Sequence, residues 1–184
     1  MNTIQIRSIL SSDVLCQSVG IHVGAREQFW KQICNFPTGC FVFNTHYSHQ
    51  PGEHWLAVYA NDSEVDFFDS FGRSVSFYPD VNEILSIHGG YETIRSNETQ
   101  LQNFLSTVCG DYCVYFCLLR SRGWSMDEIV RSLRDIGDSE MRDHSIRRFI
   151  IQTYPNFEFI EDNTVEGIDG VHIQGTNLLS KLLK

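Results

Sequence analysis

The sequence predicts a single α+β domain, with strands in the first half of the chain and helices in the second. The chain has 184 residues, which is the length of one ordinary domain, so we take residues 1–184 as one unit. Short apolar segments bounded by turn residues cluster between positions 41 and 70, which is typical of strands. From position 109 onward, longer apolar segments with capping signals predict helices, and strands followed by helices indicate the α+β class.

The strands of the first half are placed by their apolar residues and by the turns between them. A short helix is expected first, over Ile4–Leu10. The expected strands are Phe41–Thr45, His54–Ala60 and Val65–Ser70. The polar segment His46–Glu53 forms a loop between the first two strands. The turn residues Asn61–Glu64 join the last two, which predicts an antiparallel hairpin.

The middle of the chain changes from strands to helices. Val75–Ile87 is expected to be helical over part of its length, until Gly89-Gly90 breaks it, and Tyr91–Arg95 reads as a short strand. Cys109–Arg122 is apolar enough for a buried helix, and Gly123 suits the position just past its end.

Two more helices are predicted by their capping residues. Ser125 and Glu128 have the spacing of a capping box, so a helix begins there. Asp138 or Ser139 caps the last helix, which ends before Pro155.

The charge balance excludes some classes of partner. The chain has 14 Lys and Arg against 23 Asp and Glu, a net charge of -9, whereas proteins that coat DNA or anionic lipid are usually basic. We therefore expect neither nucleic acid nor a membrane as partner. No apolar segment is long enough to span a bilayer, and the first residues lack the pattern of a secretory signal.

The cysteine pattern favours free thiols. The six cysteines are Cys16, Cys34, Cys40, Cys109, Cys113 and Cys117. The last three are spaced four apart, which places them along one helix face rather than at loops that disulfides would join. We expect a reducing, intracellular compartment. No CxxC pair occurs, so no metal site is expected.

Three residues in the order His, acid, Cys suggest a thiol nucleophile. His54 begins a strand, Asp69 ends the returning strand, and Cys109 opens a buried helix. The partial positive charge of a helix N-terminus favours a thiolate, as does a neighbouring imidazolium, and an acid on the far ring nitrogen orients the histidine. Each residue alone has a structural explanation: a strand-start histidine, a turn aspartate and a small helical core cysteine.

An acyl-transfer site also needs donors for the oxyanion of its intermediate. The backbone N–H of Cys109 is one candidate. The side-chain amide of Gln102, seven residues earlier, is a second, and Gln100 is its rival.

Three sequence blocks resemble adenain, the cysteine protease of adenoviruses, and related proteases of large DNA transposons and viruses. More distantly they resemble the proteases that process SUMO and other ubiquitin-like proteins. The blocks are Phe43-Asn44-Thr45 before Gly52-Glu53-His54-Trp55, Phe68-Asp69-Ser70-Phe71-Gly72, and Gln102 before Cys109-Gly110-x-x-Cys113. They span less than half of the chain, and their joint order and spacing carry the resemblance.

The resemblance implies a papain-like cysteine protease core of the adenain type, with a central mixed or antiparallel sheet flanked by helices. It implies that Cys109 is the nucleophile, His54 the general base, Asp69 the residue that orients His54, and Gln102 an oxyanion donor. Trp55 and Gly110 are then expected at the substrate-binding cleft. The family cleaves at small or Gly-containing sites.

The resemblance also implies a biological setting. Protein substrates are expected, among them structural precursors of viral or transposon-encoded particles. The enzyme is expected to act as a monomer, in the nucleus or cytoplasm of a host cell, or in the virion if the protein is viral.

Departures from adenain bear on its activators. Adenain has a glutamate where Asp69 stands, although the distant ubiquitin-like-protein proteases have Asp. Adenain's cysteine for a peptide activator falls at Tyr91 here, so that disulfide cannot form. Adenain is basic and uses DNA, whereas this chain is acidic. We therefore expect no cofactor.

Two other activities use the same triad and stay open. One is a deconjugating protease for a ubiquitin-like modifier, and the other is an acyltransferase. A binding module with a decayed site is disfavoured because all four site residues are present.

Overall fold

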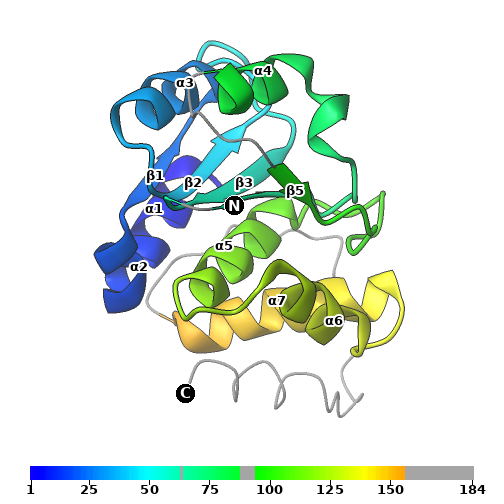
Figure 1. Ribbon diagram of the computed structural model, residues 1–184. Helices are drawn as coiled ribbons and strands as arrows, with labels where there is room; N and C mark the ends of the chain where they lie inside the picture. The colour runs from blue at the N-terminus through cyan, green and yellow to red at the C-terminus, as the bar shows by residue number, and fades with distance from the viewer. Residues whose placement is uncertain (63, 88–93, 156–184) are drawn as a thin grey trace.

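A five-stranded sheet lies at the centre of the molecule, with helices on both faces (Figure 1). The computed structural model describes residues 1–62, 64–87 and 94–155. The strands are β1 (Ile21–Gly24), β2 (Gly39–Asn44), β3 (Trp55–Ala60), β4 (Val65–Phe68) and β5 (Ile94–Ser96). This arrangement confirms the predicted fold class. The predicted Gly89-Gly90 break and the first part of the Tyr91–Arg95 strand lie outside the described residues.

The helices occupy the ranges between and after the strands. They are α1 (Thr3–Ser12), α2 (Val14–Val19), α3 (Arg26–Asn35), α4 (Pro79–Ile87), α5 (Cys109–Arg120), α6 (Met126–Arg134) and α7 (Ser139–Thr153). A short 3-10 turn, Val75–Phe77, precedes α4. In the described residues no helix is long and apolar enough to cross a membrane.

The sheet is mixed and its strands follow one another in chain order. β2, β3 and β4 are antiparallel neighbours, as the predicted hairpin requires, with Ala57 opposite Phe68 in the β3–β4 pair. The edge strands run parallel to their neighbours, β1 to β2 and β5 to β4. The start of β3 and the end of β4 therefore lie side by side at one end of the hairpin, and His54 and Asp69 lie there.

Alternation along the central strands buries both faces of the sheet. Cys40 and Val42 of β2 pack in the core with α1, α5 and α7, whereas Phe41 and Phe43 pack on the other side with α3 and α4. Helix α5 lies within the first core, and all of its residues are buried. Its position between the sheet and the outer helices fixes its first residue, Cys109, relative to the hairpin (Figure 1).

The predicted caps are confirmed. Ser125 Oγ accepts a hydrogen bond from Glu128 N and the Glu128 carboxylate accepts one from Ser125 N, which is the reciprocal pattern of a capping box. Asp138, not Ser139, caps α7. Helix α5 ends at Arg120, two residues before the predicted end, and Ser121 is its C-cap. Gly123 lies in the turn that follows, with a φ of +83°, a left-handed conformation that glycine adopts without strain.

Candidate active site

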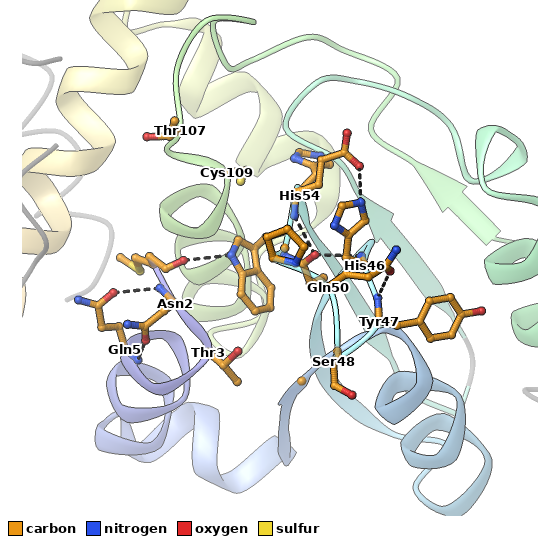
Figure 2. A pocket seen from close by; sticks show the side chains of 18 of the residues that line it. Asn2, Thr3, Gln5, His46, Tyr47, Ser48, Gln50, His54, Thr107 and Cys109 are labelled. Atoms are coloured by element: carbon orange, nitrogen blue, oxygen red, sulfur yellow. Dashed lines mark hydrogen bonds and ion pairs between the residues drawn. The ribbon is translucent and has the colours of Figure 1, made fainter.

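A pocket of about 570 Å³ opens where α5 begins. Its wall includes the predicted residues His54, Trp55, Gln102 and Cys109. Figure 2 shows Cys109 and His54 next to each other in this pocket, with α1 residues on one side and residues of the loop before His54 on the other. Residues that lie apart in the sequence are thus gathered around one sulfur atom.

Cys109 is the first residue of α5, and Val108 is its N-cap. The first N–H groups of a helix have no partner within it, and the helix dipole adds a partial positive charge there. Both features stabilise a thiolate and place backbone donors beside it. The side chain is close to the surface, since Cys109 keeps 7% of its area exposed, whereas Cys113 and Cys117 on the same helix have none.

His54 and Asp69 form a buried hydrogen-bonded pair. His54 Nε2 lies 2.7 Å from Asp69 Oδ1. The Asp69 bond occupies Nε2, so Nδ1 is the ring atom left for the thiol of Cys109. Burial alone would lower the pKa of His54, but the hydrogen bonds to Asp69 and Cys109, together with their charges, raise it to about 9. The imidazole therefore holds its proton at neutral pH, which suits an ion pair with a thiolate.

The Asp69 carboxylate is completely buried and accepts from three donors. Oδ1 also accepts from the backbone N–H of Phe71 at 2.8 Å. Oδ2 accepts from the hydroxyl of Tyr78 at 2.8 Å. The Asn97 amide bonds both to Asp69 N and to Asp69 O, at 2.9 and 2.8 Å. Asp69 is thus fixed through its backbone and through both carboxylate oxygens.

Aromatic rings hold the His54 imidazole from one side. The ring stacks on Phe71, with centroids 4.6 Å apart, and Phe71 in turn stacks on Phe104 at 5.3 Å. Gly72 follows with a φ of +72°, and a Cβ there would lie 2.4 Å from the backbone of Thr99. This close approach joins the loop that carries Asp69 to the segment that leads to Gln102.

Gln102 is buried, and its amide orientation is fixed by its neighbours. Its Oε1 accepts from Ser70 Oγ at 2.7 Å, and its Nε2 donates to Ser106 O at 2.8 Å and Ser106 Oγ at 3.0 Å. Gln102 lines the pocket, and Gln100 is not among the lining residues. The geometry therefore favours Gln102 over its rival. In the structure both acceptors of Nε2 are atoms of Ser106, so an oxyanion would compete with them.

The two predicted substrate-binding residues are placed differently. Trp55 forms part of the pocket wall, and its indole Nε1 donates to Met1 O at 3.1 Å. Gly110 is buried and does not line the pocket. A Cβ on Gly110 would lie 3.1 Å from Met1 Cβ and 3.4 Å from Trp55 Cδ1, so its small size lets α1 and Trp55 approach α5.

The loop before His54 is held by the side-chain amide of Asn44, a residue that the sequence analysis quoted in a sequence block without giving it a role in the site. Asn44 Oδ1, at the end of β2, accepts from His46 N at 2.9 Å and from Glu53 N at 3.1 Å. The His46 ring pairs with Glu53 across the loop, Nε2 to Oε2 at 3.1 Å (Figure 2). These contacts close the loop at its base, immediately before His54.

The structure thus brings His54, Asp69, Gln102 and Cys109 to one place. It adds Tyr78, Asn97 and Asn44, which the sequence analysis missed as site residues. In the described residues no group of three or more His, Cys, Asp or Glu side chains is arranged to hold a metal ion.

Comparisons with known proteins add a likeness to a solved structure. No protein-family model matches the chain, and no curated protein matches it. Among solved structures, the chain is similar to the crystal structure of the ASFV pS273R protease, with a TM-score of 0.37 and 23% sequence identity. The match covers 57% of this chain and 40% of that one, so it spans less than half of that protein's length.

Proposed function

We propose that the protein is a cysteine-type endopeptidase that uses Cys109 as nucleophile, His54 as acid and base, and Asp69 as the residue that orients His54. The carrying observation is the buried 2.7 Å bond between His54 and Asp69, together with the pocket at the start of α5 that both His54 and Cys109 line. A histidine held by a carboxylate beside a helix-terminal thiol has the components of covalent acyl transfer.

The reaction follows from these positions. The Cys109 thiolate attacks the scissile carbonyl carbon, and the negative charge that develops on its oxygen is met by the Cys109 N–H and by Gln102. Protonated His54 gives its proton to the leaving amine, which departs as the C–N bond breaks and a thioester remains. Neutral His54 then removes a proton from water. The hydroxide adds to the thioester carbonyl, and collapse of this second tetrahedral intermediate breaks the C–S bond and releases the carboxylic acid product. The Cys109 thiolate leaves, and the proton taken from water stays on His54, so the starting thiolate and protonated histidine are restored.

The substrate and setting rest on the resemblance to adenain. We propose protein substrates cleaved at small or Gly-containing sites, in the maturation of viral or transposon-encoded particles. The enzyme acts as a monomer in a reducing intracellular compartment, without DNA or peptide activator. The name of the ASFV protein, a protease, agrees with the enzyme class proposed here.

Mutations of the triad test the proposal. Cys109→Ala and His54→Ala are each expected to lower cleavage of Gly-containing peptides by at least about 1,000-fold, because the nucleophile and its base act as one unit. Iodoacetamide labelling of Cys109, followed by mass spectrometry, gives a readout that needs no known substrate. It is best done in a Cys34→Ser background, since Cys34 is the exposed cysteine.

Cys113→Ala is the matched control. Cys113 lies one helical turn after Cys109 and is fully buried, and burial raises the pKa of its thiol. This variant is expected to keep cleavage and labelling. If Cys113→Ala were inactive while it remained folded, the assignment of the nucleophile would be wrong.

The two alternatives differ in substrate. Fusions that end in a ubiquitin-like modifier, compared with Gly-containing peptides, distinguish deconjugation from general endopeptidase activity. Transfer of a labelled acetyl group from acetyl-coenzyme A, without hydrolysis of any peptide, would indicate an acyltransferase instead.

A further inference from the structure

A tyrosine outside the triad, Tyr78, contacts Asp69 from the segment between β4 and α4. Tyr78 follows the 3-10 turn Val75–Phe77 and precedes α4. Its hydroxyl donates to Asp69 Oδ2 at 2.8 Å. Its ring lies against Phe67 of β4, with centroids 5.6 Å apart. The hydroxyl is therefore directed at the carboxylate from the side opposite His54.

We propose that Tyr78 is a positioning residue that anchors Asp69 through Oδ2 and draws off part of its negative charge, so that His54 does not bind its proton too tightly. The inference rests on the proposed function, because it concerns the same histidine and thiol.

The two carboxylate oxygens of Asp69 have separate tasks. Oδ1 receives His54 Nε2 at 2.7 Å and Phe71 N at 2.8 Å, whereas Oδ2 receives the phenol. Bonds to both oxygens fix the plane of the carboxylate, and that plane sets the direction of the bond to His54. A hydrogen bond to a carboxylate also stabilises its charge and lessens its pull on a neighbouring cation.

The surroundings of Tyr78 make its hydroxyl the donor, and Asp69 the acceptor, of this hydrogen bond. Burial of the phenol, the charge of Asp69 and the bond to that carboxylate raise the pKa of Tyr78, while Arg73 opposes them less strongly. Tyr78 is therefore a neutral donor over the working pH range. Arg73 Nη1 donates to the same hydroxyl at 3.4 Å, and its guanidinium lies 5.3 Å from the Phe71 ring centre. A cation thus stands behind the phenol and polarises it toward Asp69.

Ionisable groups from two parts of the chain surround the His54–Asp69 pair. Cys109 and Cys113 are on α5, and Arg73 and Tyr78 are in the segment after β4. Cys113 is buried and its thiol pKa is raised, so it stays neutral. Of the uncharged partners, Tyr78 is the one whose hydroxyl can be deleted with little change in shape, by Tyr78→Phe.

The test is the titration of His54, followed by NMR through the imidazole protons and assigned with a His54→Gln variant. Tyr78→Phe leaves the charge of Asp69 less satisfied, so we expect the pKa of His54 to rise by roughly half a pH unit. Tyr115→Phe is the matched control, because the Tyr115 hydroxyl is buried on α5 and faces Ser132 at 3.4 Å.

The outcomes separate the two proposals. If Cys109 of the parent protein showed no His54-dependent reactivity, the proposed function would fail. If the parent behaved as expected and Tyr78→Phe left the titration of His54 unchanged, or moved it downward, the role of Tyr78 would be refuted and the triad would stand. Thermal unfolding of both Phe variants checks that a shift does not come from loss of structure.

Discussion

At the scale of single residues, the protonation of His54 links the site to the stability of the fold. Asp69 and Cys109 raise the pKa of His54 to about 9, from the 6.5 of an unperturbed imidazole. The folded protein therefore binds this proton more tightly than the unfolded chain does. The resulting stabilisation is complete below pH 6.5 and is lost as the pH rises through about 9.

This linkage predicts a pH-dependent difference between the parent and a His54→Gln variant. A pKa that rises from 6.5 to about 9 corresponds to about 3 kcal/mol of stabilisation. We expect the free energy of unfolding of the parent to fall, relative to the variant, between pH 6 and pH 10 by an amount of that order. Urea denaturation at several pH values measures it. Parallel curves for the two proteins would contradict the raised pKa.

Two of the residues that the sequence analysis missed, Tyr78 and Asn97, share one property. Tyr78 lies nine positions after Asp69 and Asn97 lies 28 positions after it, and both reach Asp69 only because loops return to the end of β4. No motif spacing marks such contacts. By contrast, the sequence pattern predicts where strands and helices begin and end. It therefore places His54, Asp69 and Cys109, which lie at such ends, without knowledge of the loops.

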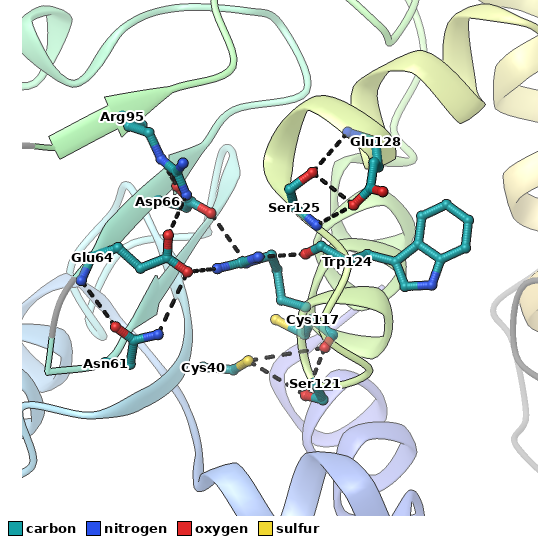
Figure 3. Close-up of polar contacts among 11 residues, drawn as sticks. Cys40, Asn61, Glu64, Asp66, Arg95, Cys117, Ser121, Trp124, Ser125 and Glu128 are labelled. Atoms are coloured by element: carbon teal, nitrogen blue, oxygen red, sulfur yellow. Dashed lines mark hydrogen bonds and ion pairs between the residues drawn. The ribbon is translucent and has the colours of Figure 1, made fainter.

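At the scale of elements, the far end of α5 is tied to the same hairpin that carries His54 and Asp69. Arg120, at the last position of α5, lies 2.5 Å from Glu64 and 3.1 Å from Asp66. Glu64 immediately precedes β4, and Asp66 lies on it. Arg95 of β5 contacts the same two acids, at 2.6 and 2.8 Å (Figure 3). The Arg120 guanidinium also lies over the Tyr59 ring. Both ends of α5 are thus fixed against the hairpin.

Removal of this anchor is expected to destabilise the protein. Burial raises the pKa of Asp66, and the positive charges of Arg95 and Arg120 oppose that rise. Arg120→Met retains much of the buried volume but leaves the acids with one cation, so we expect a loss of roughly 3 kcal/mol. Urea denaturation measures it.

Arg131→Met on α6 is the control for the Arg120 variant. Arg131 is exposed, and its replacement is expected to change stability by less than about 0.5 kcal/mol. An Arg120→Met protein as stable as the control would refute the anchoring role.

Elements with strong periodicity or caps were predictable, and short ones were not. The β3–β4 hairpin and α5 to α7 were expected close to their observed bounds, because apolar pattern and turn residues act locally. The segment from α2 through β1 to α3 was not expected. β1 has only four residues, and its place at the sheet edge depends on parallel pairing with β2. Pairing direction comes from the path of the chain, which a local pattern does not encode.

At the scale of the whole molecule, the net charge of -9 bears on which macromolecules the protein can bind. A polyanion is repelled by such a surface unless a basic patch receives it. We therefore propose that DNA does not activate the protein.

Peptide cleavage in low salt, with and without double-stranded DNA, tests this proposal. We expect equal rates, because an acidic protein releases few counterions from DNA. A rise in rate on addition of DNA that disappears at higher salt would contradict the expectation.

The indole of Trp55 has a practical consequence, because it lies in the pocket wall with 8% of its area exposed. Its emission depends on the polarity around the ring, so it serves as a built-in optical reporter of pocket occupancy. Replacement of the other two tryptophans, Trp30 and Trp124, by phenylalanine leaves Trp55 as the single tryptophan. Libraries of peptides can then be screened for binding to a Cys109→Ala protein before any cleavage sequence is known.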